Sequence, residues 1–85
     1  MEGVILNFRL SNHNKNRNQV IVEIDGINNR KDALKLIGKK VILEINNKKK
    51  IGKIIRAHGN KGRVLVRFRE GLSGYVLMKK VIIED

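Results

Sequence analysis

The sequence predicts an all-β protein, a small six-stranded antiparallel barrel with one short helix. Apolar and polar residues alternate in short runs, as in strands with one buried face, and turn residues separate the runs at roughly 8 to 12 residue intervals. The chain has 85 residues, enough for one hydrophobic core, so we expect a single domain over residues 1–85. Closing the sheet into a barrel removes the adhesive strand edges that an open sheet would expose.

The first two runs are expected to pair as a hairpin. The first run places its apolar residues at alternate positions, Val4, Leu6, Phe8 and Leu10. This period of two predicts that these four side chains share one face of the strand and that the opposite face is exposed to solvent. Residues 11–18 are wholly polar, which predicts an exposed loop. The second run alternates from Val20 to Ile24 and ends at the turn signal Asp25-Gly26.

A short helix is expected between Asn29 and Gly38. Asn29 is a residue type that caps helix N-termini, Asp32 follows three positions later, and Gly38 is typical of a helix end. The residues expected on its buried face are Ala33, Leu34 and Ile37.

The second half of the chain predicts three more strands and a terminal one. We expect Val41, Leu43 and Ile45 to face inward, a turn at Asn46-Asn47 with a loop tip of Lys48, Lys49 and Lys50, and a strand from Ile51 to His58 with a bulge near Gly52. Gly59 to Gly62 then predicts a turn. The next strand, Arg63 to Arg69, directs Val64, Val66 and Phe68 into the core, and Val81 with Ile83 forms the last strand.

The charge of the chain points to a polyanionic partner. Nineteen Lys and Arg against eight Asp and Glu give a net charge of +11, and residues 39–80 alone carry thirteen basic and two acidic side chains. So dense a positive charge on a small surface favours nucleic acid. No run approaches the roughly 20 apolar residues of a membrane span, and Glu2 stands where a signal peptide would carry positive charge, so we expect a cytoplasmic protein without a membrane partner.

The candidate nucleic-acid site lies on the fifth strand and the turn before it. If Val64, Val66 and Phe68 face inward, then Arg63, Arg67 and Arg69 face outward over about 20 Å, enough for several phosphates. The turn from His58 to Gly62 is expected to present backbone N–H groups to a phosphate, although such a turn is also a plain hairpin connection. The full set of predicted RNA-binding residues is Arg17, Lys48, Lys49, Lys50, Arg56, His58, Gly59, Lys61, Gly62, Arg63, Arg67 and Arg69.

Catalysis and bound metal are disfavoured by the residue types present. The chain has no Cys, its two histidines lie in separate predicted turns, and no carboxylate pair or metal-ligand spacing appears. We therefore expect no enzyme activity, no cofactor and no metal site. One Tyr and two Phe are too few for an aromatic platform that stacks successive bases.

An ordered set of short motifs resembles one known family. The segments are Asn29-Arg-Lys-Asp-Ala to Lys39, His58-Gly-Asn-Lys-Gly62, Val66-Arg-Phe68 and Gly71-Leu-Ser-Gly74. Together they are similar, in order and spacing, to the large-subunit ribosomal protein family thirty-five-Ae of archaea and eukaryotes, over about residues 3–83. Two positions depart from the family pattern, Ser73 where Pro is frequent and Met78 where Gly is frequent.

The resemblance implies a barrel of the kind found in second domains of translation factors, bound to large-subunit rRNA beside neighbouring ribosomal proteins. It implies a structural protein of an archaeal ribosome, monomeric outside it. Apart from the resemblance, tRNA is a further candidate partner of so basic a surface. The sequence leaves two alternative hypotheses for the function of a small basic barrel. One is a protein of an RNA-modification particle or of chromatin, and the other is a module that contacts tRNA transiently. Sedimentation with large subunits through a high-salt wash distinguishes them.

Overall fold

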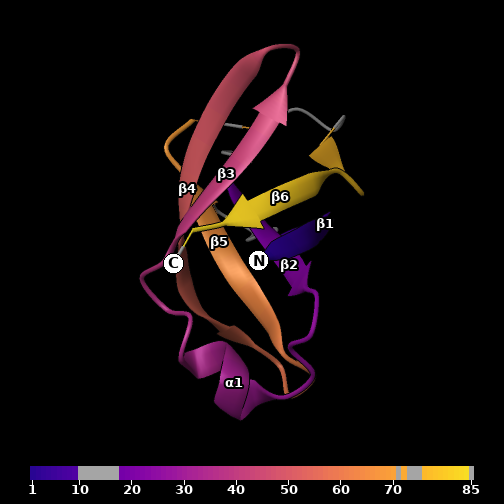
Figure 1. Cartoon of the computed structure of the whole chain (residues 1–85), viewed down its shortest axis with the longest axis vertical. Coiled ribbons are helices and arrows are strands. Elements are labelled where there is room, and N and C mark those ends of the chain that lie inside the picture. Colours follow the sequence, from indigo (N-terminus) through magenta and orange to yellow (C-terminus); the bar gives the residue numbers. More distant parts are fainter. Residues whose placement is uncertain (10–17, 71, 73–75, 85) are drawn as a thin grey trace.

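The computed structural model describes residues 1–9, 18–70, 72 and 76–84 and confirms a closed antiparallel barrel. The strands follow one another around the barrel in the order β1-β2-β5-β4-β3-β6, and β6 closes it against β1. The elements are β1 (Glu2–Phe8), β2 (Gln19–Ile24), α1 (Arg30–Leu34), β3 (Lys40–Ile45), β4 (Lys48–His58), β5 (Arg63–Phe68) and β6 (Lys80–Ile83). Figure 1 shows α1 at one end of the molecule and the tip of the β3–β4 hairpin at the other.

The barrel interior is filled by aliphatic side chains and one aromatic ring, that of Phe68. The predicted inward positions of β2 and β5 are confirmed, since Val20, Val22, Ile24, Val64, Val66 and Phe68 are all at most 1% exposed. No described polar or charged side chain is buried in this core. The alternation therefore identified the core side of both strands, although the outer side of β5 also contains a fully buried residue, Leu65.

The predicted facing of β1 is wrong. Ile5 is the fully buried residue of this strand, whereas Val4 and Leu6 are only half-buried. The register with β2 shifts between Ile5 and Asn7, which is a β-bulge, and this shift returns Phe8 to the core side. Three consecutive apolar residues leave the period of two ambiguous, so the sequence pattern favoured the wrong face. Leu10, predicted as the end of the first strand, and residues 11–17 of the predicted loop lie outside the described residues.

The helix forms where it was expected but is short. The Asn29 side chain accepts a hydrogen bond from the backbone N–H of Asp32 at 2.8 Å, and its amide nitrogen donates to the Asp32 carboxylate at 3.2 Å. This pair of bonds fixes the first turn. The buried residues after it are Ala33 and Leu36, so the predicted burial of Leu34 and Ile37 is wrong. The helical hydrogen bonds end at Leu34, and the turns after it change which residues face the barrel.

Two predictions for β4 need correction. The strand begins at Lys48, so the three lysines are not a loop tip: they pair with β3 directly after a two-residue turn. Asn46 and Asn47 make that turn with φ of 51° and 66°, as a tight hairpin requires. The bulge of β4 lies between Ile54 and Arg56 and not near Gly52.

Gly52 has a different role in β4. A Cβ atom at this position would lie 2.8 Å from the backbone oxygen of Arg67 and 2.9 Å from the ring of Phe68. The glycine therefore permits a close approach of β4 to β5 over the aromatic ring. None of the helices in the described part of the chain has the length and apolar character needed to cross a membrane.

Candidate nucleic-acid interface

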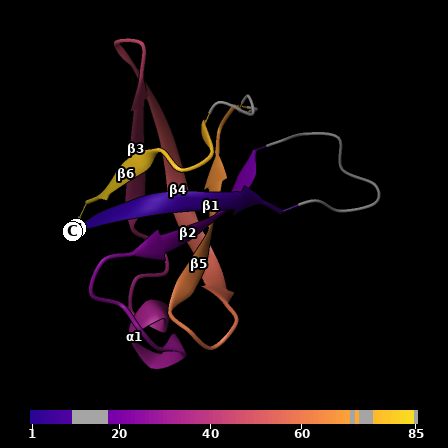
Figure 2. The same cartoon turned by 90° about the vertical axis from the view of Figure 1, so that its right-hand side faces the viewer.

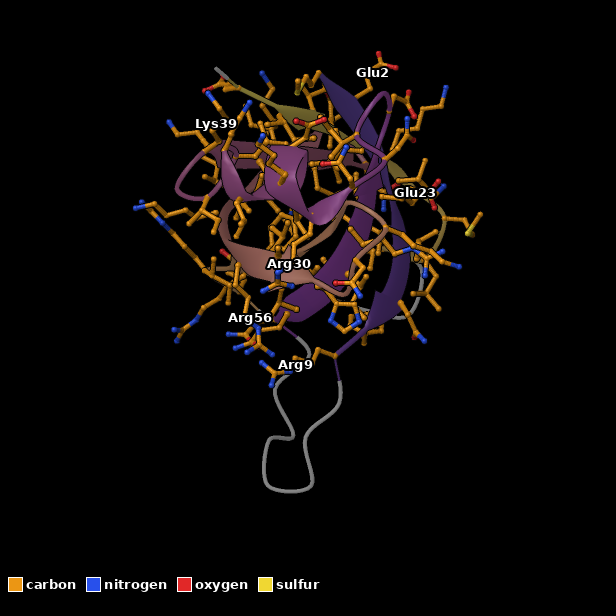
Figure 3. All side chains as sticks on the ribbon, turned by 90° about the horizontal axis from the view of Figure 1, so that it is seen from below. Glu2, Arg9, Glu23, Arg30, Lys39 and Arg56 are labelled. Carbon is orange, nitrogen blue, oxygen red and sulfur yellow. The ribbon has the colours of Figure 1, made fainter. Side chains whose placement is uncertain are left out.

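The positive charge of the barrel is concentrated on two neighbouring strands. β4 and β5 together carry seven basic and no acidic residues. The outward cations of β5 and of β4 after Ile51 form one surface with Arg69, which directly follows β5. We call this surface the cationic face, and its members are Lys53, Arg56, Arg63, Arg67 and Arg69. The predicted outward facing of the arginines on β5 is thus confirmed. Seen from the α1 end, Arg56 and Arg9 lie on the side of the barrel opposite Glu2 (Figure 3).

Three cations lie in register across three strands. Lys40 of β3 pairs with Lys53 of β4, which pairs with Arg67 of β5. Paired residues in a sheet direct their side chains to the same side, with Cβ atoms about 4.5 to 5.5 Å apart, and like charges placed in this way destabilise the sheet. Lys40 has a carboxylate nearby, that of Glu84 at 4.0 Å. Among the described residues no acidic side chain forms an ion pair with Lys53 or Arg67.

A shallow groove runs beside this row of cations. Its volume is about 350 Å³, and it is lined by Gly38, Lys40, Ile51, Gly52, Lys53, Arg67 and Arg69. Arg69 is held here by a backbone hydrogen bond from its N–H to the carbonyl of Ile51, at 3.3 Å. Four basic side chains and no carboxylate line the groove, so an anion is the ligand that its electrostatic potential favours.

A second hollow adjoins the groove where β5 ends. It is lined by Asn18, Arg67, Phe68 and Arg69. The side-chain oxygen of Asn18 is buried here without a hydrogen-bond partner among the described residues, while its backbone carbonyl accepts from Phe68 at 2.7 Å. The hollow therefore offers two guanidinium donors to a ligand.

The three lysines at the start of β4 do not act as one cluster. Alternation along the strand places Lys48 and Lys50 on the side of the inward residues of β3 and Lys49 on the outer side, opposite Glu44. Lys50 donates a hydrogen bond to the carboxylate of Glu70 at 2.9 Å. This bond, the positive charge of Lys50 and that of Lys48 lower the pKa of Glu70. Lys50 is thus partly neutralised within the protein.

The turn from His58 to Gly62 lies at the other end of β4, about 33 Å from Lys48 along the strand. Gly59 and Gly62 have φ of 71° and 90°, as predicted. Gly62 is buried, and a Cβ there would lie 2.5 Å from the carbonyl oxygen of Ile27. The left-handed conformation of Gly62 is therefore required by packing against the segment before α1. Arg30 also holds this turn, donating to the carbonyl of Gly59 at 3.1 Å.

The predicted site residues therefore separate into three groups. Arg56, Arg63, Arg67 and Arg69 belong to the cationic face; His58, Gly59, Lys61 and Gly62 form the turn; and Lys48, Lys49 and Lys50 begin β4. Arg17 lies outside the described residues. Lys40 and Lys53 were missed, because their positions appear unremarkable until the register places them beside Arg67.

A metal site was not expected from the sequence. In the parts of the chain that the structure describes, no three His, Asp or Glu side chains come close enough to hold a metal ion. The geometry instead defines a class of protein: a small closed antiparallel barrel with one cationic outer face.

Comparison with known proteins places the chain within that class. A family model described as ribosomal protein L35Ae matches residues 1–83. The chain belongs to the ribosomal protein L35Ae family. It is 40% identical over 84 residues to large ribosomal subunit protein eL33 of Methanopyrus kandleri, covering 96% of this chain and 93% of that protein.

Two eukaryotic relatives carry the same name. The protein of Tetrahymena thermophila is 30% identical over 80 residues, covering 85% of this chain and 71% of the relative. That of Dictyostelium discoideum is 32% identical over 81 residues, covering 84% and 77%. The resemblance deduced from the short motifs is confirmed.

Proposed function

We propose that this protein is a structural constituent of the large ribosomal subunit and binds rRNA through its cationic face. The observation that carries the proposal is the row of Lys40, Lys53 and Arg67 in register, a repulsive arrangement that a bound polyanion stabilises. The names of the relatives, each a large-subunit protein, support this partner. The role is structural and not catalytic, and it places the protein on cytoplasmic ribosomes.

The hollow at the end of β5 supports a nucleotide contact. Arg67 and Arg69 line it, and their guanidinium groups can donate hydrogen bonds to one phosphate. We therefore propose that these two arginines contact one nucleotide, and that the remaining cations of the cationic face contact neighbouring phosphates.

The turn and the first lysines of β4 are proposed as supporting contacts. Lys61 extends the positive surface past Arg63, with His58 beside it as a polar contact, and Lys49 extends it past Ile51. Gly62 has a packing role against Ile27 that requires a glycine even without a bound phosphate, whereas nothing lies within 4 Å of a Cβ at Gly59. We retain Gly59 and Gly62 as candidate backbone contacts, with Lys48 and Lys50 as phosphate contacts of lesser weight.

Two further partner properties are proposed. The net charge of +11 makes copies of the chain repel one another, which supports a monomer outside the ribosome. tRNA presents the same phosphates and sugar hydroxyls as rRNA, so the same face is the proposed contact for it. If this is correct, rRNA and tRNA compete for the chain in a filter-binding assay.

The experiment is sedimentation combined with a salt titration. The tagged chain is expected to remain with large subunits after a high-salt wash. The isolated chain is expected to bind rRNA with a steep linear fall of log affinity against log salt, because each neutralised phosphate releases condensed counterions. A chain found with small RNA particles or DNA, or a flat salt dependence, would contradict the proposal.

A further inference from the structure

A hollow on the outer face of β1 and β2 is lined by aliphatic side chains and by carboxylates. It has a volume of about 190 Å³ and is lined by Val4, Leu6, Glu23, Asp25 and Met78, which together we call the Met78 patch. Both charges that line it are negative, although the chain as a whole carries +11. The charge of this hollow is therefore opposite in sign to the charge of the groove beside Arg67.

The bulge of β1 builds the apolar part of the patch. Ile5 takes the core position of the strand, so Val4 lies on the outer face, directly opposite Glu23 in the register with β2. The shift between Ile5 and Asn7 leaves Leu6 unpaired with β2 and half-buried at the edge of the hollow. Bulges commonly redirect one side chain in this way. Two residues that the pattern predicted for the core thus form an outer surface.

Met78 is held in a conformation that suits glycine better. Its φ is 64°. The N–H of Met78 donates a hydrogen bond to the carbonyl of Ile5 at 2.7 Å, and the N–H of Ile5 donates to the backbone carbonyl of Lys79 at 3.0 Å. These bonds fix the strained backbone, yet the side chain is 68% exposed, and that of Leu77 is 40% exposed. Backbone strain combined with an exposed flexible thioether is an arrangement found at recognition surfaces.

The charges around the hollow disfavour RNA. Asp25 lies beside Glu2, whose carbonyl accepts from the Asp25 N–H at 2.9 Å. Glu23 has one weak partner, Arg63 at 3.9 Å, and Lys80 flanks Val4 on the β6 side. Carboxylates repel phosphates, and aliphatic side chains offer no hydrogen bonds to bases, so a nucleic acid gains nothing here.

We propose that the Met78 patch docks a segment of another protein that carries Lys or Arg beside an aliphatic residue. The aliphatic side chain covers Leu6 and Met78, and the cation lies between Glu23 and Asp25. Charge complementarity selects this occupant over a second copy of the chain, since two copies of charge +11 repel. That the segment belongs to a neighbouring ribosomal protein rests on the proposed function; the chemistry of the patch does not.

Photo-crosslinking in cells tests the proposal. The full chain carries p-benzoylphenylalanine in place of Leu77, or in place of Leu34 on α1 as a control that is similarly exposed, at 47%. After irradiation, the expected product at position 77 is a ribonuclease-resistant adduct with one protein, and its crosslinked peptide contains Lys or Arg and an aliphatic residue. An adduct with RNA, an adduct with a second copy, or no adduct would overturn the proposal.

Matched variants of the crosslinking chain separate docking from folding. Asp25→Lys is expected to abolish the adduct, whereas Glu44→Lys on β3, which changes the net charge equally, preserves it. Met78→Gly removes the exposed side chain and relieves the strained φ, so it should abolish the adduct while melting no lower than the parent. Retention of the adduct in both patch variants would overturn the proposal.

Sedimentation of lysates from the same cells tests the ribosomal function separately from docking at the Met78 patch. A specific protein adduct on a chain that does not sediment with large subunits would leave the Met78 patch standing and contradict the ribosomal function. A chain that sediments with large subunits but gives no protein adduct would contradict the Met78 patch and support the ribosomal function.

Discussion

The outer face of β4 and β5 and the outer face of β6, β1 and β2 are built on the same alternation of strand residues, yet their charges differ. The first two strands carry seven basic and no acidic residues, and the other three carry one basic and two acidic. Figure 2 shows the strands of both faces around one barrel. Because both faces cover the same core, folding does not account for the difference. Residue types at outward positions are not constrained by the core, so they can match the charge of the partner that binds each face.

The two faces also differ in how they use internal ion pairs. On the cationic face Lys53 and Arg67 lie together with no ion-pair partner among the described residues. The ion pairs lie at the borders of that face, where Lys40, at the end of the same row, lies 4.0 Å from Glu84, and Arg63 lies 3.9 Å from Glu23 of the other face. Unpaired like charges on a surface lower the stability of the free folded protein, and they favour the binding of a polyanion that neutralises them.

The largest expected effect concerns the turn at the end of the cationic face. Gly62→Ala should lower the free energy of unfolding by about 3 kcal/mol, because the new Cβ meets the Ile27 carbonyl and φ is positive. Gly59→Ala should cost about 1 kcal/mol, since its φ is positive but nothing lies within 4 Å. Denaturant unfolding measures both. Equal losses would mean that packing against Ile27 does not fix this turn.

A second comparison asks whether RNA affinity depends on the face or on total charge. Lys53→Ala combined with Arg67→Ala should weaken rRNA binding about tenfold or more and reduce the salt slope by about two units. Lys79→Ala combined with Lys80→Ala removes the same charge from the other side of the barrel and should have a much smaller effect. Filter binding over a salt series checks both. Equal losses would show that only the net charge matters.

Relief of the like-charge row should move stability and binding in opposite directions. Lys53→Gln removes the charge between Lys40 and Arg67, so the free energy of unfolding without RNA should rise by about 0.5 kcal/mol at low salt. The gain should shrink as salt is added. The same variant should bind rRNA more weakly. A chain that is destabilised at low salt would contradict the repulsion argument.

The smallest expected effect is that of pH on the Lys50–Glu70 pair. Because the pKa of Glu70 is lowered in the folded chain, its carboxylate stabilises the fold above the ordinary glutamate range. That contribution is lost as pH falls through the lowered pKa. Glu70→Gln should therefore be slightly less stable than the parent at neutral pH and equal to it in acid. Since Glu70 is exposed, thermal melts at several pH values should differ little.

Much of the fold follows from the sequence because local signals agreed with the tertiary structure. The strands β2 and β5 alternate with a period of two, Asn29 and Asp32 begin the helix, and the glycine and asparagine turns have the positive φ that they favour. These features depend on residues close together in the chain. The arginines of β5 were placed correctly for the same reason.

The sequence alone could not place what depends on pairing between distant segments. The bulge of β1 decided that Val4 and Leu6 face outward, and a run of three apolar residues carries no signal for it. The register of β3, β4 and β5 decided that Lys40, Lys53 and Arg67 share one row. The sequence singled out Arg67 but not Lys40 or Lys53, because only hydrogen bonding between strands sets which residues lie opposite one another.

The sequence by itself determined the barrel, its turns, its positive charge and the family. The tertiary structure decided how that charge is distributed, since closure of the barrel brought β4 and β5 together and set β1 on the far side. The physical reason is that alternation records only whether a side chain faces the core or the solvent. Which neighbours it meets there is fixed by strand order, register and bulges.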